Sequence, residues 1–321
     1  MKTIFLTILI IIGFSTYAQN ISEKNDDVAK IPIAVFIPQQ IDQMPEAARS
    51  ILTNKLSQIV TQNGMGDSAH NQRFILTANI NVLSKDITPT APPMQAFTLD
   101  INLYIGDGID GIKFASFSKT VKGVGENETK AYISALKNLK ANDPQYQIFI
   151  DKGKSKIIEF YKMNCNSFVK EAKTLASQSQ YDEAIYKLSS VPDACKECYD
   201  KCMDAITPIY KSQIDKACKT NLAEAVNSWN TNQDASGASS ASEYLAQIDP
   251  NASCFKEAQV LSNKIAKRIF EIDKRDWNFK MKEYQNDADI RKSTLKAAAD
   301  IGVAYAKGNS KSIIYNVRGW W

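Results

Sequence analysis

The chain has 321 residues, of which 44% are hydrophobic and 23% are charged, enough apolar material for about two globular domains. Its 39 lysines and arginines only slightly outnumber its 35 aspartates and glutamates and are spread along the sequence, which excludes the clustered basic surface of a nucleic-acid-binding protein. A single histidine largely excludes the imidazole sites of general-base catalysis and metal binding.

The first residues have the pattern of an export signal. Lys2 supplies a positive charge, Ile4 to Phe14 form an apolar core, and Thr16-Tyr17-Ala18 form a small-residue cleavage site. We therefore expect a signal peptide over residues 1–18 and a polar lead-in over 19–30. The mature protein is expected in the periplasm, at the outer membrane or outside the cell. Peripheral membrane contact stays open, but no later stretch is long and apolar enough to span a bilayer.

Residues 31–142 combine strand and helix patterns. The predicted strands cover 31–37, 74–82, 97–105 and 113–124, and the predicted helices cover 47–60 and 129–139. The first strand is an apolar run bounded by prolines, whereas the other three place apolar residues at every second position. This order predicts an α+β domain in which an antiparallel-rich sheet carries two helices.

The order of these elements resembles small α/β domains of the bacterial envelope, found in TolB N-terminal regions and in curli-secretion and flagellar-ring accessory proteins. The resemblance covers residues 31–140 and rests on the pattern of elements, not on a signature motif. It implies a docking or assembly module that is not an enzyme.

Two patterns in this domain could be taken for ligand sites. Gly123-Val124-Gly125 precedes a helix as a phosphate-binding loop would, but Glu126 and Glu128 would repel a phosphate. We expect the end of a strand followed by a capped helix. Three acids around a glycine-rich turn could bind calcium; we expect solvated turn residues at Asp100, Asp107 and Asp110.

A helical hairpin follows at residues 164–192. Apolar or small residues recur three, four or seven positions apart, at Phe168, Ala172, Leu175, Tyr181, Ala184 and Leu188. Ser177 to Gln180 form a polar break, and Pro192 ends the second helix. These positions resemble those of a tetratricopeptide repeat, from which Glu171 departs, since the family usually has leucine there. The resemblance implies a helical repeat that offers a concave surface to a peptide or protein segment.

A second copy of the hairpin follows an inserted segment. Cys165, Val169, Ala172, Ala184, Leu188, Val191 and Cys195 align with Cys218, Leu222, Ala225, Ala241, Leu245, Ile248 and Cys254. The insertion, residues 230–240, is rich in serine and glycine, has no apolar periodicity and is expected to be a loop. A long helical stretch follows Cys254 and ends at Gly308. We therefore expect a tetratricopeptide-like domain over 164–309, after a linking helix over 143–163.

Six cysteines fall in this second half, and an exported chain favours disulfides. The candidates are Cys165, Cys195, Cys198, Cys202, Cys218 and Cys254. If the two copies are alike, Cys165 pairs with Cys195 or Cys198, and Cys218 pairs with Cys254. Cys202 then takes the remaining partner.

Two other uses of the cysteines stay open. Cys195, Cys198 and Cys202 have a spacing that could hold a metal, although no histidine lies nearby. Cys195 and Cys198 could instead form a redox pair at the start of a helix, where the helix dipole lowers a thiol pKa.

Aromatic residues suggest where a partner could bind. The candidate contacts are Tyr181, Tyr186, Trp229, Tyr244, Tyr315, Trp320 and Trp321. The last three belong to an aromatic tail over residues 310–321, which could either cap a core or anchor a partner or membrane surface.

These observations favour a non-enzymatic adaptor or assembly protein of the bacterial cell envelope that binds a protein or peptide segment and needs no cofactor. A thiol–disulfide redox protein using Cys195 and Cys198 is one alternative. A structural subunit of an envelope complex is another.

Overall fold

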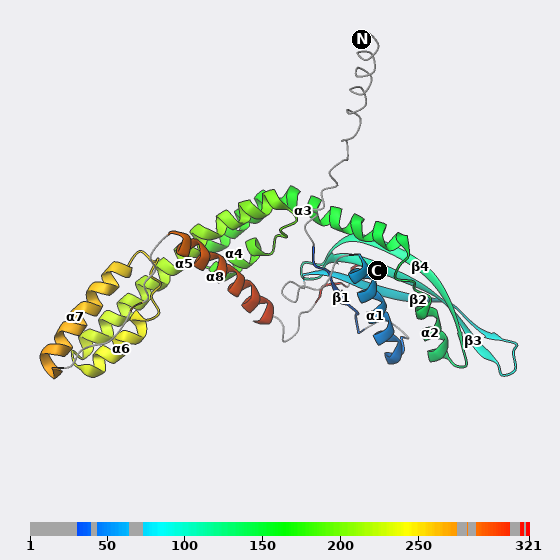
Figure 1. Ribbon diagram of the computed structural model, residues 1–321, viewed down its shortest axis with the longest axis horizontal. Helices are drawn as coiled ribbons and strands as arrows, with labels where there is room; N and C mark the ends of the chain where they lie inside the picture. Colours follow the sequence, from blue (N-terminus) through cyan, green and yellow to red (C-terminus); the bar gives the residue numbers. More distant parts are fainter. Residues whose placement is uncertain are drawn as a thin grey trace, which may run out of the picture. The chain divides into compact units, whose positions relative to one another are not determined.

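The computed structural model describes residues 31–39, 44–63, 73–274, 281, 287–308, 315–317 and 319–321. The expected signal peptide and polar lead-in lie outside these residues. A sheet with helices precedes a largely helical second half (Figure 1), as expected for an α+β domain followed by helices. Among the described helices, none combines the length and the apolar composition needed to cross a membrane.

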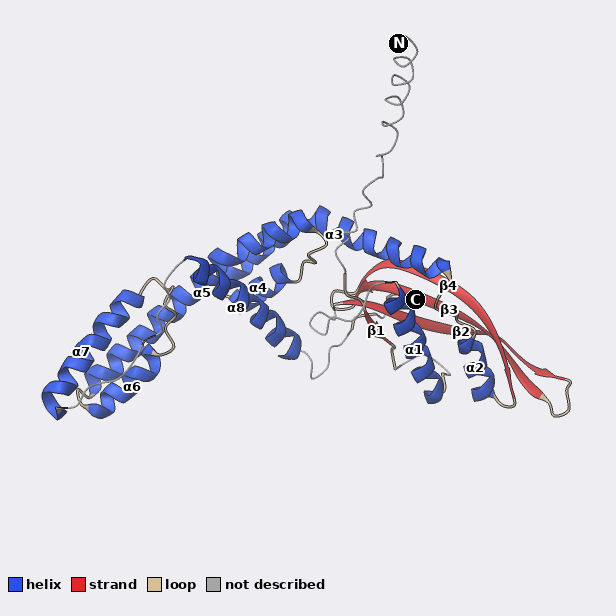
Figure 2. Ribbon diagram, viewed as in Figure 1, coloured by secondary structure: helices blue, strands red, loops and turns tan. Residues whose placement is uncertain are grey.

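Four strands form one sheet in the described residues, in the order β1-β2-β3-β4 (Figure 2). They are β1 (Ala34–Phe36), β2 (Phe74–Thr88), β3 (Met94–Asp107) and β4 (Ile112–Gly125). β1 runs parallel to β2, and the other pairs are antiparallel. Helix α1 (Glu46–Gln62) lies between β1 and β2 in sequence and makes the crossover that a parallel pair requires.

The predicted strands are confirmed in place but not in length. β1 is shorter than the predicted segment because Pro32 and Pro38 flank it, and proline has no N–H for the ladder. β2 and β3 are longer because their pairing continues past a bulge between Val82 and Ser84. The alternation of apolar residues stops at this bulge, so it could not predict the extension.

One face of the sheet carries the core. Side chains at every second position are buried, among them Leu76, Ala78, Ile80, Leu99, Ile101 and Leu103. They pack with residues of α1, α2 (Glu128–Lys137) and α3 (Pro144–Ser177) in a continuous hydrophobic cluster. The two predicted helices therefore cover this face together with α3.

Helix α2 lies close against β4 because two glycines of the strand have no side chain. A Cβ at Gly123 would lie 2.1 Å from the backbone nitrogen of Ala135, and one at Gly125 would lie 2.3 Å from that of Ala131. Asn127 caps the helix by accepting a hydrogen bond from a backbone N–H. The expected strand end and capped helix are confirmed.

A buried charge cluster joins the sheet to α3. The Nε atom of Arg73 donates to Oδ2 of Asp107 at 2.5 Å and to the hydroxyl of Tyr161 at 3.1 Å, and the guanidinium also pairs with Asp110. Asp107 is fully buried. The prediction that Asp107 is a solvated turn residue is therefore wrong, since its charge is compensated inside the protein. Asp100 lies on β3, half-buried.

In the part of the second half that the structure describes, the end of α3 is followed by five further helices. These are α4 (Tyr181–Ser189), α5 (Lys196–Thr231), α6 (Ala235–Leu245), α7 (Phe255–Asp273) and α8 (Asp287–Gly308). The predicted linking helix and the first helix of the hairpin form one unbroken helix, α3, which crosses the predicted boundary at 163/164. The predicted tight turn before α4 is confirmed, with Ser179 at a φ of 63°.

Two expectations in this half are wrong. Residues 230–240 are not a loop, because α6 begins inside them, capped by Asp234 and buried through Ala238, Ala241 and Leu245. The apolar pattern did not predict this helix, because its buried positions carry small residues. Their spacing is helical, but their hydrophobicity is low. The stretch after Cys254 is also interrupted: α7 ends before Lys274, which has a left-handed conformation.

The C-terminal residues pack on the other face of the sheet. Trp320 and Val317 form a small buried cluster with Ile75 and Tyr104. The indole N–H of Trp320 donates to the backbone carbonyl of Gly111 at 2.9 Å. The expectation that the tail caps a core is therefore met by Trp320, which is 3% exposed, whereas Trp321 is 49% exposed.

Truncating Trp320 should destabilise the protein much more than truncating its neighbour. Trp320→Ala removes a buried ring and a hydrogen bond, so we expect a loss of about 3–5 kcal/mol in the free energy of unfolding. Trp321→Ala is the matched control and should cost less than about 1 kcal/mol. Urea unfolding followed by circular dichroism measures both, and equal losses would contradict the packing of the tail.

Candidate functional site

Two disulfides connect long helices in the second half. Cys165 of α3 is bonded to Cys198 of α5, and Cys218 of α5 is bonded to Cys254 at the start of α7. Both bridges are among the predicted pairings, with Cys198 chosen over Cys195. Each fastens neighbouring long helices around the shorter helix that separates them in sequence.

The expectation of a third bridge is wrong. Cys195 and Cys202 are free and buried. The sulfur of Cys202 lies 4.0 Å from that of Cys198, one turn away on the same helix. Cys198 is already bonded to Cys165, so the remaining pair is Cys195 and Cys202. These two lie about two helical turns apart at the start of α5, a separation of about 10 Å that is too long for a disulfide.

The cysteine cluster was also a candidate for metal binding or redox chemistry. The ligand atoms of Cys165, Cys198 and Cys202 lie within 4.8 Å of one another, but the first two share a disulfide. Burial raises the pKa of Cys202 to about 11 and also raises the pKa of Cys195. A redox-active thiol requires the opposite shift.

The disulfides define the register of the two copies of the hairpin. They match Cys165 with Cys218 and Cys198 with Cys254, whereas the sequence alignment matched Cys195 with Cys254. Residues aligned within the copies are buried in both: Ala172, Ala184, Leu188 and Val191 in the first, and Ala225, Ala241, Leu245 and Ile248 in the second. The copies thus share their buried positions as well as their bridges.

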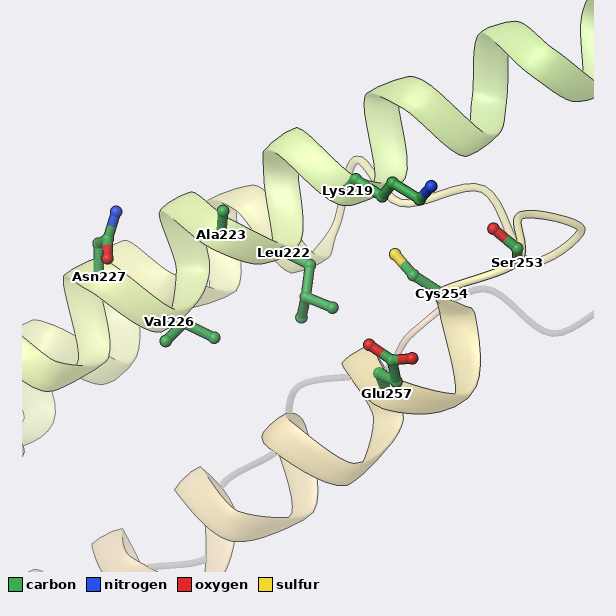
Figure 3. Close-up of a pocket in the computed structure, with 8 residues that line it drawn as sticks. All are labelled: Lys219, Leu222, Ala223, Val226, Asn227, Ser253, Cys254 and Glu257. Atoms are coloured by element: carbon green, nitrogen blue, oxygen red, sulfur yellow. The ribbon is translucent and has the colours of Figure 1, made fainter.

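A groove of about 480 Å³ lies between α5 and α7, here called the α5–α7 groove. Its lining residues are Lys219, Leu222, Ala223, Val226 and Asn227 of α5, with Ser253, Cys254 and Glu257 on the other side. Figure 3 shows Leu222 and Val226 pointing from α5 toward the side of α7. The Cys218–Cys254 bridge therefore fastens the two helices at one end of the groove.

A second groove, of about 520 Å³, lies between α3 and α5 and is called the α3–α5 groove. Its lining residues are Asn166, Val169, Lys170, Lys173, Thr174 and Ser177 of α3, and Lys201 of α5. The amino group of Lys201 crosses to Asn166 and donates a hydrogen bond to its side chain. The Cys165–Cys198 bridge lies beside this contact.

The two grooves occupy equivalent places. In the register of the disulfides, Asn166, Val169, Lys170, Lys173, Thr174 and Lys201 correspond to Lys219, Leu222, Ala223, Val226, Asn227 and Glu257. A surface hollow that recurs at the same positions of two copies is a property of the repeated unit. We therefore take the pair of grooves as the candidate functional site.

The predicted aromatic contacts do not line these grooves. Tyr181, Tyr186 and Tyr244 are half-buried, and Lys216 lies over the ring of Tyr181. Trp229 is 1% exposed in the core of the second copy, so its assignment as a surface contact is wrong. Tyr315 and Trp320 pack on the sheet, leaving Trp321 at the surface.

The groove residues escaped the sequence analysis because they are ordinary lysines and small apolar residues. The repetition of the hairpin was the one feature of the sequence that could have pointed to them. Positions next to Cys165 and Cys218 differ in chemistry between the copies, although the buried positions agree. Comparisons with protein-family models, with curated proteins and with solved structures found no significant match.

Removing the second bridge should destabilise the helical half. In Cys218→Ser/Cys254→Ser the unfolded chain is no longer closed into a loop of 36 residues, which costs about 3–4 kcal/mol. Urea unfolding of the double variant measures the loss. A reductant should affect the variant less than the original protein, because one bridge is already gone; an equal effect would contradict the assignment.

The two free thiols should be almost inert in the folded protein. A pKa near 11 for Cys202 leaves about 100-fold less thiolate at neutral pH than an unperturbed thiol would have, and burial blocks access. We expect alkylation of Cys195 and Cys202 only after unfolding, measured by mass spectrometry. Fast labelling of Cys195 in the native state would favour the redox alternative.

Proposed function

We propose that the protein is an exported, non-enzymatic adaptor of the bacterial cell envelope that holds a segment of a partner protein in its two grooves. The observation that carries the proposal is the recurrence of the groove at equivalent positions of the two copies. Stacked helical units bind extended segments along such surfaces. The tetratricopeptide-like character of the hairpins is part of this proposal.

The disulfides support a binding role because they hold the grooves open before a partner arrives. Each bridge joins the two helices that form a groove wall, so less conformational freedom is lost on binding. The bridges are also compatible with export into an oxidising compartment, in the periplasm or at the outer membrane. The raised thiol pKa values of Cys195 and Cys202 argue against the redox alternative.

Site-specific photo-cross-linking in cells tests the proposal. A photoreactive residue in place of Val226 or Thr174 lies in the α5–α7 or the α3–α5 groove, respectively. The matched controls replace Val260 and Thr220, which are exposed but line neither groove. We expect one partner to cross-link from both groove positions and not from the controls.

A substitution gives the energetic counterpart. Val226→Asp places a charge among apolar groove residues, so we expect about tenfold weaker binding of the cross-linked partner. Val260→Asp, on the exposed side of α7, should leave the affinity unchanged. Equal cross-linking from all four positions, or equal effects of the two substitutions on affinity, would contradict the proposal that the partner binds in the grooves.

A further inference from the structure

The two grooves have the same framework but different linings. Where the α3–α5 groove has Lys170 and Lys173, the α5–α7 groove has Ala223 and Val226. The first groove gains a third ammonium from Lys201, whose counterpart in the second groove is Glu257. The repeated unit therefore presents one basic groove and one groove of little net charge, half of whose lining residues are apolar.

The ammonium groups of the basic groove can meet an anionic partner, and that of Lys201 also donates a hydrogen bond to Asn166. Lys170 and Lys173 lie one turn apart on α3, and both are exposed. Within the described residues no ion pair involves them or Lys201, although Glu197 and Asp204 lie about one turn from Lys201 on α5. Three ammonium groups around one hollow repel one another, and carboxylates placed between them would relieve that repulsion.

The α5–α7 groove favours a different kind of partner side chain. Leu222 and Val226 point from α5 toward the side of α7 (Figure 3). Lys219 and Glu257 carry opposite charges, so this groove has little net charge of its own. Apolar side chains of a partner would be removed from water here, which is the main source of affinity in such a hollow.

Helix α5 sets the distance and the direction between the grooves. Lys201 belongs to the first groove and Lys219 to the second, and the residues between them make about five turns of one helix. Five complete turns return to the same side, and the bend expected at Pro208 does not change their number. The separation is about 27 Å, which about eight residues of extended chain can span.

Resting on the proposed function, we propose that the partner is a single extended peptide segment in two parts. A cluster of aspartates or glutamates occupies the α3–α5 groove, and apolar side chains about eight residues away occupy the α5–α7 groove. The charges of the first groove fix the register and orientation of the segment, and the second groove supplies apolar burial.

Selection from a phage-displayed library of random peptides of about 16 residues tests the inference on the purified full chain. Enriched peptides should contain an acidic cluster and an apolar cluster about eight residues apart. Selection against K170Q/K173Q/K201Q should lose the acidic cluster. Enrichment without acidic residues would overturn this inference but leave the proposed function standing, whereas no enrichment at all would contradict both.

Fluorescence anisotropy with the most enriched peptide measures the effect. We expect K170Q/K173Q/K201Q to bind about tenfold more weakly and to lose most of the salt dependence. The matched control, K256Q/K264Q/K267Q, removes the same charge from exposed positions of α7 and should bind normally. Inorganic phosphate should not displace the peptide at moderate ionic strength. Displacement of the peptide by phosphate, or an equal loss of affinity in both variants, would overturn the inference of a two-part segment.

Discussion

The ion pair between Arg73 and Asp107 holds together parts of the chain that are far apart in sequence. Burying two charges costs several kcal/mol per ion unless each is fully compensated. Asp107 offsets much of this cost with the guanidinium at 2.5 Å and with two backbone N–H groups of its own turn, each at 3.0 Å, although burial still raises its pKa. Arg73 offsets its own cost with Asp107, Asp110 and the hydroxyl of Tyr161. Because Tyr161 lies on α3, the pair fixes that helix against the turn between β3 and β4.

The same turn receives the C-terminal residues on its other side. The backbone N–H of Asn316 donates to the carbonyl of Gly108 at 2.7 Å, and the amino group of Lys113 donates to the carbonyl of Trp320 at 2.7 Å. Gly111, with a φ of 73°, allows the turn to pass close to Asn316. The buried ion pairs on one side of this turn and the hydrogen bonds on its other side thus connect the residue before β2, helix α3 and the end of the chain.

Helix α3 connects the sheet to the candidate site. It runs without interruption from Pro144 beside the sheet to Ser177 at the end of the α3–α5 groove, and one hydrophobic cluster accompanies it. The Cys165–Cys198 bridge then fixes α5 to α3, and the Cys218–Cys254 bridge fixes α7 to α5. Each groove wall is therefore held by covalent or buried contacts, while the exposed groove residues differ in charge. Substitutions at these exposed positions therefore change the charge of a groove and leave the core intact.

The sequence by itself determined the strands, α1, α2, the hairpin turn before α4 and the Cys218–Cys254 pairing. Period-two and period-3.6 patterns and the echo of the hairpin are local properties of a chain. The tertiary structure alone decided the burial of Asp107, because the partner that compensates its charge lies 34 residues away. The tertiary structure also decided which cysteine bonds to Cys165. Cys198 faces Cys165 and Cys195 does not, and this depends on how α3 and α5 pack. The grooves belong to the same class: their residues carry no local signature, and only the packing of α3, α5 and α7 makes hollows of them.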